Sequence, residues 1–331
     1  MRFVFRADAS VTQGSGHVMR CLTLAEEVVA EGHEVVFASA VASIGWLDAA
    51  LRDSGYPTVA VEVDRIDRDA LLALEPDWVV VDSYRIAAGE ISALDEAVAV
   101  LAIVDGDARG IEAALYLEQN LGSDNQPWPG RESRMLAGAH YALIRDGFIS
   151  ARRPNPARII DVPHVTAFMG GTDPTGVIVA VAEQLALVSM PFTLTVVAPE
   201  RFHGEVAAAL PAAQVIAPTT DLPALLGRSD VIVSAAGTSA WDVCTLAVPA
   251  LFIGVVDNQS ASLRALIDGG YALGVDLAAG GDVTEIAPAV ASLLSNQALR
   301  DSLSARCAGQ FDGLGKNRVV AAMTASTRSP R

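Results

Sequence analysis

Basic residues are scarce in this chain. Its 331 residues include 23 Lys and Arg against 39 Asp and Glu, so the formal net charge is −16. Proteins that bind nucleic acid need a basic surface to neutralise the phosphates, and we therefore expect no nucleic-acid partner. A nucleotide ligand remains compatible with this charge, because backbone N–H groups and helix ends can hold phosphate groups locally.

Long apolar runs are also missing. The longest ones have the length of strands, such as Trp78–Val81 and Ala250–Ile253, whereas a membrane-spanning helix needs about 20 residues. The chain begins with charged residues at Arg2, Arg6 and Asp8, a start that is too polar for a signal peptide. These features predict a soluble, cytoplasmic protein without membrane insertion.

Cysteine is rare as well. The three cysteines, Cys21, Cys244 and Cys307, are odd in number and far apart, without metal-type spacing. This usage indicates buried thiols in a reducing compartment rather than disulfides. The histidines show no ligand spacing either, so we expect neither a metal nor a cofactor.

What the chain does have is a regular alternation of strand-like and helix-like segments. A strand at 3–6 precedes a helix at 17–31, whose expected apolar stripe is Val18, Leu22, Ala25 and Val29. Further strands are expected at 34–39, 58–62, 78–82 and 100–104, and then at 165–169, 192–197, 214–217, 230–234 and 250–253. This alternation predicts parallel sheets covered by helices on both faces.

The alternation stops at residues 150–164, a segment rich in proline and arginine that suggests a linker. We therefore expect two similar α/β halves with a cleft between them. The N-terminal Rossmann-like domain would span 1–150, the C-terminal one 163–315, and a C-terminal helix and tail 316–331. Ligands of such sheets bind beyond the carboxyl ends of the strands.

The first candidate site follows the first strand, where Gly14 and Gly16 precede a helix that starts near His17. The positive helix end attracts anions and disfavours imidazolium, which would keep His17 neutral and able to act as a general base. The alternative, that His17 merely starts the helix, is about equally compatible with the residues. A dinucleotide site is rejected, because GSGHVM lacks the third glycine and the second strand ends without an acid.

Two turns of the second half are candidates for binding a diphosphate. Gly170 and Gly171 end a strand, and Thr172 and Asp173 can cap the helix that follows. A capped strand-to-helix turn without a ligand would look the same. The second turn lies at 236–239, where another helix starts after a strand.

Polar residues accompany the second of these turns. Asp242 lies one helical turn in, where a carboxylate could hold two ribose hydroxyls, although the helix dipole alone would also explain an acid there. Asn258 and Gln259 follow the next strand, and their amides suit sugar hydroxyls or acetamido groups. Ordinary turn chemistry would equally account for them.

Asp105-Gly106-Asp107 has the spacing of a metal-binding D-x-D motif. The motif is weak, because Asp and Gly are common in turns after strands. Asp82 also ends a strand and is placed at the same edge of the sheet.

Together these clusters resemble the UDP-sugar hydrolases of pseudaminic acid biosynthesis, which are related to spore-coat polysaccharide proteins. The resemblance rests on RADAS and GSGHVMRCLTLA (6–25), VVDSY (80–84), EQN (118–120), LAGAHYALIRDGF (136–148), MGGTDP (169–174), AAGTSAWD (235–242), DNQ (257–259) and GKNRV (315–319). The chain departs from the family in having Asp242 in place of the usual Glu, and Gly106 between two acids that are often adjacent.

The resemblance implies a GT-B-like fold of two Rossmann-like domains and a hydrolase that removes UDP from UDP-2,4-diacetamido-2,4,6-trideoxy-β-L-altropyranose. It implies that His17 is the catalytic base. We assign nucleotide binding to Gly14, Gly16, Gly170, Gly171, Thr172, Asp173, Ala236, Gly237, Thr238, Ser239 and Asp242. We assign substrate binding to Arg20, Asp82, Tyr84, Asn120, Arg145, Asn258 and Gln259.

Two alternatives stay open at this point. One is a GT-B glycosyltransferase, in which an acceptor alcohol replaces water, and the other is a non-catalytic nucleotide-sugar-binding protein. The expected partner is a UDP-sugar substrate, and the expected state is a monomer or dimer.

Overall fold

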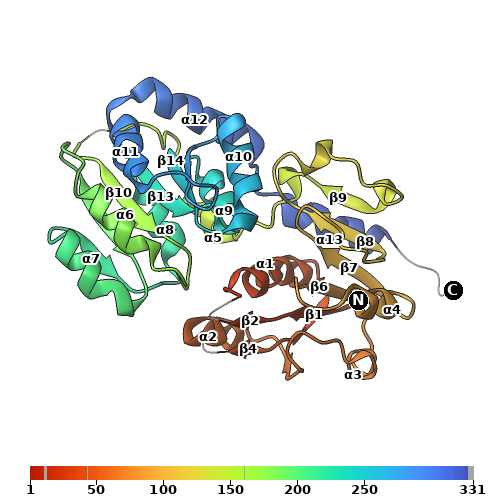
Figure 1. The fold of residues 1–331 in the computed structure, drawn as a ribbon. Helices are drawn as coiled ribbons and strands as arrows, with labels where there is room; N and C mark the ends of the chain where they lie inside the picture. Colours follow the sequence, from red (N-terminus) through yellow and green to blue (C-terminus); the bar gives the residue numbers. More distant parts are fainter. Residues whose placement is uncertain (11–12, 43, 160, 327–331) are drawn as a thin grey trace. The chain divides into compact units, whose positions relative to one another are not determined.

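The computed structural model describes residues 1–10, 13–42, 44–159 and 161–326 (Figure 1). The chain forms two compact units. The first consists of Met1–Leu143 and the segment from Leu314 onward, and the second of Ile144–Gly313. The two α/β domains expected from the sequence are therefore present, with one parallel sheet in each unit.

The sheet of the first unit has seven strands in the order β5-β3-β1-β6-β7-β8-β9, and neighbouring strands are parallel. The strands are β1 (Arg2–Ala7), β3 (Glu34–Ala38), β5 (Thr58–Val59), β6 (Trp78–Asp82), β7 (Ala99–Ile103), β8 (Leu115–Glu118) and β9 (Met135–Ala137). A separate short pair is formed by β2 (Ala9–Ser10) and β4 (Val41–Ala42).

Helices cover both faces of this sheet, because successive strand side chains point to opposite sides. On one face Phe3 and Phe5 pack in a cluster with α1 (Gly16–Ala30) and α13 (Gly315–Ala325). On the other face Val4 belongs to a cluster with α4 (Ala88–Asp95). The remaining helices of the unit are α2 (Gly45–Asp53) and α3 (Arg68–Leu72).

The apolar stripe of α1 differs in one position from the expected one. Val18, Leu22 and Ala25 are buried as expected, but Val28 completes the stripe and Val29 is 42% exposed.

The second unit contains a six-stranded parallel sheet in the order β12-β11-β10-β13-β14-β15. Its strands are β10 (His164–Phe168), β11 (Thr193–Val197), β12 (Gln214–Ile216), β13 (Val231–Ala235), β14 (Ala250–Gly254) and β15 (Leu273–Asp276). Its helices are α5 (Asp146–Ala151), α6 (Val177–Leu185), α7 (His203–Ala209), α8 (Leu222–Arg228), α9 (Ser239–Leu246), α10 (Ser260–Asp268), α11 (Ile286–Ser295) and α12 (Gln297–Gln310).

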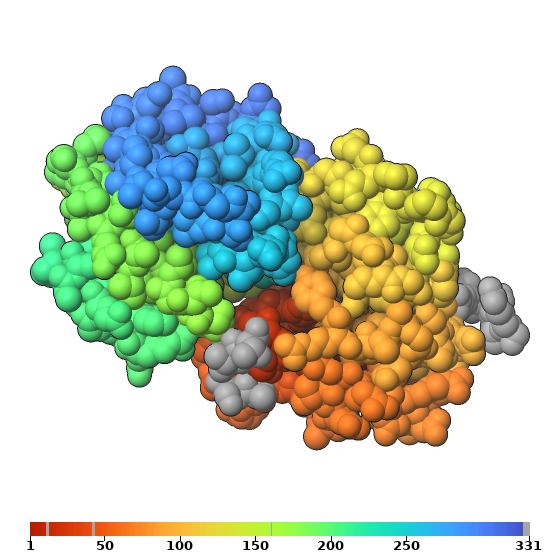
Figure 2. Space-filling view, in the orientation of Figure 1, coloured from red at the N-terminus to blue at the C-terminus, as the bar shows by residue number. Residues whose placement is uncertain are grey.

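The inward side chains of α6 and α11 form one apolar core with the sheet of this unit. In Figure 2 the residues of α10 to α12, coloured blue, form a continuous part of its surface.

The arginine-rich segment at 150–164 is not a linker between the units, as the sequence had suggested. The contacts divide the chain at Leu143 and Ile144, so that α5 and the segment after it belong to the second unit. The C-terminal helix is likewise part of the first unit rather than a separate tail. No helix in the described part of the chain is long and apolar enough to span a bilayer.

Candidate active site

In the first unit, the strands β1, β6, β7 and β8 all end at one edge of the sheet, and polar residues follow each of them. His17 lies in the first turn of α1, Asp82 ends β6, Asp105 follows β7, and Asn120 follows β8. Residues that are far apart in sequence therefore come together at this edge.

His17 and Asp82 form the centre of this group. The Nδ1 atom of His17 lies 2.8 Å from Oδ1 of Asp82, and the side chain of His17 is 12% exposed. Since a carboxylate accepts the Nδ1 proton, the lone pair is placed on Nε2. The ring of Tyr84 meets the imidazole edge-on, with 4.7 Å between the ring centroids.

Arg20 joins two acids of the site, the buried Asp82 and the half-buried Asp105. Its guanidinium donates through Nε and Nη2 to the two carboxylate oxygens of Asp82, with Nη2 2.6 Å from Oδ1. It also donates from Nη2 to Asp105, at 3.0 Å. Burial would raise the pKa of the Asp82 carboxyl, but the charges of Arg20 and His17 and their hydrogen bonds outweigh it and hold the pKa below its usual value.

Asp105 accepts hydrogen bonds from three side chains. Besides Arg20, it accepts hydrogen bonds from the hydroxyl of Tyr84 and from Nδ2 of Asn120, the latter at 3.0 Å. Against the effect of burial, these donors hold the pKa of Asp105 well below its usual range. Burial and the neighbouring Asp105 carboxylate raise the pKa of the Tyr84 hydroxyl, which therefore stays protonated as a donor.

Of the residues of the first unit that were predicted to bind the substrate, some are buried by these contacts and others remain exposed. The side chains of Arg20 and Asp82 are 4% and 0% exposed and hold each other, so they are placed to orient His17. Tyr84 is 47% exposed. Asp105 is the common partner of Arg20, Tyr84 and Asn120. Its sequence signals were its place after a strand and a weak D-x-D spacing, and it was not among the predicted site residues.

The N-terminal end of α1 is open. Its N-cap residue Ser15 makes no side-chain capping hydrogen bond, and its first turn carries no acid. Gly14, with φ +82°, closes a turn by donating its N–H to the carbonyl of Ser10. The positive end of α1 beside His17 is therefore available to an anion.

In the second unit, α9 also begins with an open end. Its N-cap residue Thr238 makes no side-chain capping hydrogen bond, and Thr238 is exposed. The predicted contribution of Ala236 is not possible through its N–H, because this group donates to the carbonyl of Ile253. Asn258 is exposed, and Gln259 approaches Gly237 while its Oε1 accepts the N–H of Val255.

Asp242 is engaged by Arg145. Its Oδ2 accepts from Nε and Nη2 of Arg145 at 3.0 and 2.7 Å, and its Oδ1 accepts from the backbone N–H of Arg145 at 3.3 Å. Burial nevertheless raises the pKa of Asp242, although Arg145 opposes the shift. The ring of Phe148 lies under the guanidinium, with 4.6 Å to its centroid. The carboxylate expected to hold a ribose thus holds an arginine.

The glycine turn at 170–173 is closed by its own acid. Asp173 is 2% exposed and accepts hydrogen bonds from the backbone N–H groups of Val177 and Ile178, at 3.2 and 3.1 Å. Asp173 therefore occupies two N–H groups at the start of α6 and does not offer them to a diphosphate. The contribution of Gly170, Gly171 and Thr172 to nucleotide binding stays a prediction. Burial raises the pKa of Asp173, against the hydrogen bonds from Ile178, Val177 and Gly176.

Among the described residues, no group of three or more His, Cys, Asp or Glu side chains is placed to hold a metal ion. Asp107 is exposed and accepts the N–H of Arg109, so it does not share the surroundings of Asp105.

Comparison with known proteins defines the class of the fold. MurG from Acinetobacter baumannii matches 98% of this chain and 100% of its own, with a TM-score of 0.70 and 16% identity. The spinosyn rhamnosyltransferase SpnG, complexed with thymidine diphosphate, matches 97% and 100%, with a TM-score of 0.68 and 16% identity. UDP-GlcNAc 2-epimerase from Neisseria meningitidis, bound to UDP-GlcNAc, matches 98% and 100%, with a TM-score of 0.67 and 11% identity. The fold is the GT-B fold.

The sequence itself is similar to the spore coat polysaccharide biosynthesis protein SpsG of Bacillus subtilis (strain 168). The two are 25% identical over 229 residues, which are 66% of this chain and 63% of that protein. No family model matches the chain.

Proposed function

We propose that this chain is a hydrolase that releases UDP from a UDP-linked diacetamido-trideoxy sugar by attack of water on the anomeric carbon. The observation that carries the proposal is the pair of His17 and Asp82 at the open end of α1. A histidine whose Nδ1 donates to a carboxylate presents Nε2 as a general base, and the carboxylate stabilises the imidazolium that forms. His17 would take the proton of the attacking water.

The second unit would bind the leaving nucleotide. The uncapped start of α9 supplies N–H groups and a positive helix end, which suit a diphosphate. Arg145, held by Asp242, would add a guanidinium to the same ligand. Tyr84 and Asn258 are exposed polar residues that we assign to the sugar.

The motif resemblance and the similarity to SpsG support a role in the biosynthesis of a surface polysaccharide or of pseudaminic acid. The second candidate is a glycosyltransferase, and the similarity of the fold to SpnG favours it. In that case the same histidine would accept the proton of an acceptor hydroxyl instead of water.

A screen of UDP-, CMP-, dTDP- and GDP-sugars for nucleotide release tests the proposal. Release of UDP in the absence of any acceptor supports the hydrolase. Release that requires an added alcohol supports the transferase, and binding without release identifies a non-catalytic binder.

The bond that breaks is a separate prediction. With His17 as the base, attack at carbon transfers one water oxygen to the sugar. A reaction in ¹⁸O-water should therefore place the label in the released sugar, as measured by mass spectrometry. Label in UDP, or release of UMP with a sugar phosphate, would show attack at phosphorus and contradict the mechanism.

A further inference from the structure

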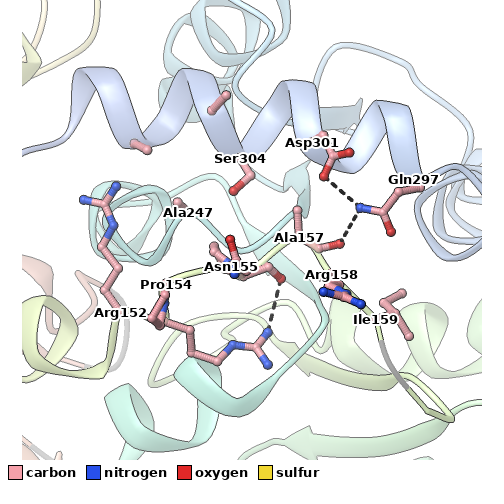
Figure 3. A pocket seen from close by; sticks show the side chains of 14 residues that line it. Arg152, Pro154, Asn155, Ala157, Arg158, Ile159, Ala247, Gln297, Asp301 and Ser304 are labelled. Carbon is pink, nitrogen blue, oxygen red and sulfur yellow. Dashed lines mark hydrogen bonds between the residues drawn. The ribbon is translucent and has the colours of Figure 1, made fainter.

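A cavity of about 630 Å³ lies in the second unit and is separate from the start of α9 (Figure 3). The segment 152–159 forms one wall and α12 another, and Ala247, which follows α9, also lines it. Arg153 locates the cavity, because its Nη2 donates to the carbonyl of Ser229 at 2.6 Å, directly before β13. The cavity is therefore at the amino-terminal edge of the sheet, whereas Gly237–Ser239 follow the carboxyl end of the same strand.

The lining of this cavity is basic, in contrast to the chain as a whole. Arg152, Arg153 and Arg158 contribute to it, and Asp301 is the one carboxylate among the described lining residues. Asp301 already accepts a hydrogen bond from Nε2 of Gln297, at 2.8 Å. Figure 3 shows Arg152 on one side of the cavity and Arg158 on the other.

The guanidinium groups in the cavity have unused donors. Nε of Arg153 is buried without a hydrogen-bond partner in the described structure. The side chains of Arg152 and Arg158 make no hydrogen bond or ion pair with any residue that the structure describes. By contrast, Arg6 and Arg20 each bind both oxygens of a carboxylate, and Arg145 donates through two nitrogens to one carboxylate oxygen.

Arg153 also forms an ion pair with Asp230, at 3.5 Å. The unpaired guanidiniums of Arg152 and Arg158 suit one chemical class of ligand. Their planar donors match phosphate oxygens, and a charge-assisted hydrogen bond is about twice as strong as a neutral one. The cavity volume falls within the range of roughly 300–1,000 Å³ that is typical of small-molecule sites. We propose that this cavity binds a small phosphate-bearing anion, in addition to the nucleotide sugar of the proposed function.

The position of the cavity also links it to the other edge of the sheet. Arg152 is the C-cap residue of α5, whose N-cap is Arg145, and Ala247 is the C-cap of α9, whose first turn carries Asp242. Both helices that hold the Arg145–Asp242 pair thus end at this cavity. An anion bound there contacts the two elements that position this pair, and any effect on nucleotide affinity must be reciprocal.

The test is a calorimetric titration of the full chain with inorganic pyrophosphate. The variants are the double substitution Arg152→Ala with Arg158→Ala and the control Arg68→Ala, an exposed arginine on α3 of the first unit. We expect the double variant to lose one binding event or to bind pyrophosphate at least about tenfold more weakly, since each lost charge-assisted hydrogen bond is worth a factor of that order. The control should bind like the wild type.

UDP titrated into the same three proteins reports the α9 site, so a loss of pyrophosphate binding with UDP binding retained is assigned to the cavity. Identical titrations of the wild type and the double variant would overturn the proposal, whatever the nucleotide-sugar screen shows. A parallel flotation assay with phosphatidylcholine vesicles containing phosphatidic acid distinguishes the source of the phosphate. If the vesicles bind the wild type but not the double variant, the phosphate group that the cavity recognises belongs to a lipid headgroup rather than to a free metabolite.

Discussion

The pairing of His17 with Asp82 allows the catalytic role to be tested at single side chains. His17→Ala removes the base, and we expect kcat to fall by about 10²–10⁴ with little change in KM. Turnover of the proposed UDP-sugar measures this, and His140→Ala, which alters an exposed histidine of the same unit, is the control.

Asp82→Asn should also lower kcat more than KM, because an amide can leave the imidazole in the wrong tautomer. If His17→Ala retains activity within a few-fold, the histidine only starts the helix.

The Arg145–Asp242 pair makes a different prediction. If Asp242 acts by holding Arg145, then Asp242→Ala and Arg145→Ala should each weaken UDP binding, and the double variant should be little worse than either. Calorimetric measurement of UDP affinity for the wild type, the two single variants and the double variant completes this double-mutant cycle. Additive losses would instead indicate that Asp242 contacts the ribose on its own, as the sequence had suggested.

The residues of the first-unit site could be predicted only in part. His17, Asp82 and Tyr84 stood out because they follow strands or start a helix. The role of Asp105 was missed, since its donors Tyr84, Arg20 and Asn120 lie 21, 85 and 15 positions away in the sequence. No local pattern encodes such distant pairings.

At the scale of the elements, the N-terminal caps decide which helix starts have N–H groups available to bind a phosphate. Asp173→Ala should destabilise the second unit by about 1 kcal/mol, because two N–H groups of α6 lose their acceptor. We expect UDP affinity to be unchanged, since the end of α6 is not the proposed diphosphate site. Urea unfolding and calorimetry measure the two effects.

Asp282→Ala is a matched control, because Asp282 caps a different short helix of the same unit by accepting the N–H of Thr284. If Asp173→Ala loses UDP binding and Asp282→Ala does not, the glycine turn at 170–173 takes part in binding the nucleotide.

Strong periodicity made many elements predictable. The strand Trp78–Asp82 is found at the expected residues, and it is buried throughout. The strands β8 and β9 were missed, because they have four and three residues and lack a distinctive run. The segment after residue 150 was misassigned for another reason. Its prolines and arginines indicate irregular backbone, but its packing against the second unit depends on tertiary contacts that composition does not reveal.

At the scale of the whole molecule, Asp82 and Asp105 of the first unit predict how stability depends on pH. The folded-state pKa values of Asp82 and Asp105 lie below the ordinary value of 3.8. Below about pH 4 the unfolded chain therefore binds protons that the folded chain does not, and the free energy of unfolding falls as the pH drops. The contribution is complete at neutral pH.

We expect Asp105→Asn to cost on the order of 3 kcal/mol at pH 7, because the buried guanidinium of Arg20 loses one of its two carboxylate partners. The cost should become progressively smaller as the pH falls from 5 to 3. Unfolding in urea measures this in a Trp241→Phe background, in which the remaining tryptophans, Trp46, Trp78 and Trp128, all belong to the first unit. Asp107→Asn is the control. If the free energies of unfolding of Asp105→Asn and of the unsubstituted chain differ by the same amount at every pH, the lowered pKa of Asp105 in the folded state is contradicted.

The C-terminal helix α13 packs with the N-terminal unit, and this affects the order in which the protein can fold during its synthesis. Val319, Val320 and Met323 of this helix are buried in the same core as Phe3 and Phe5, and the ammonium of Lys316 lies 3.8 Å from Glu27 of α1. The residues 144–313 are contiguous and can fold as soon as they leave the ribosome. The first unit emerges earlier but lacks a piece of its core until α13 arrives, so the half of the chain that is translated first is the last to be completed.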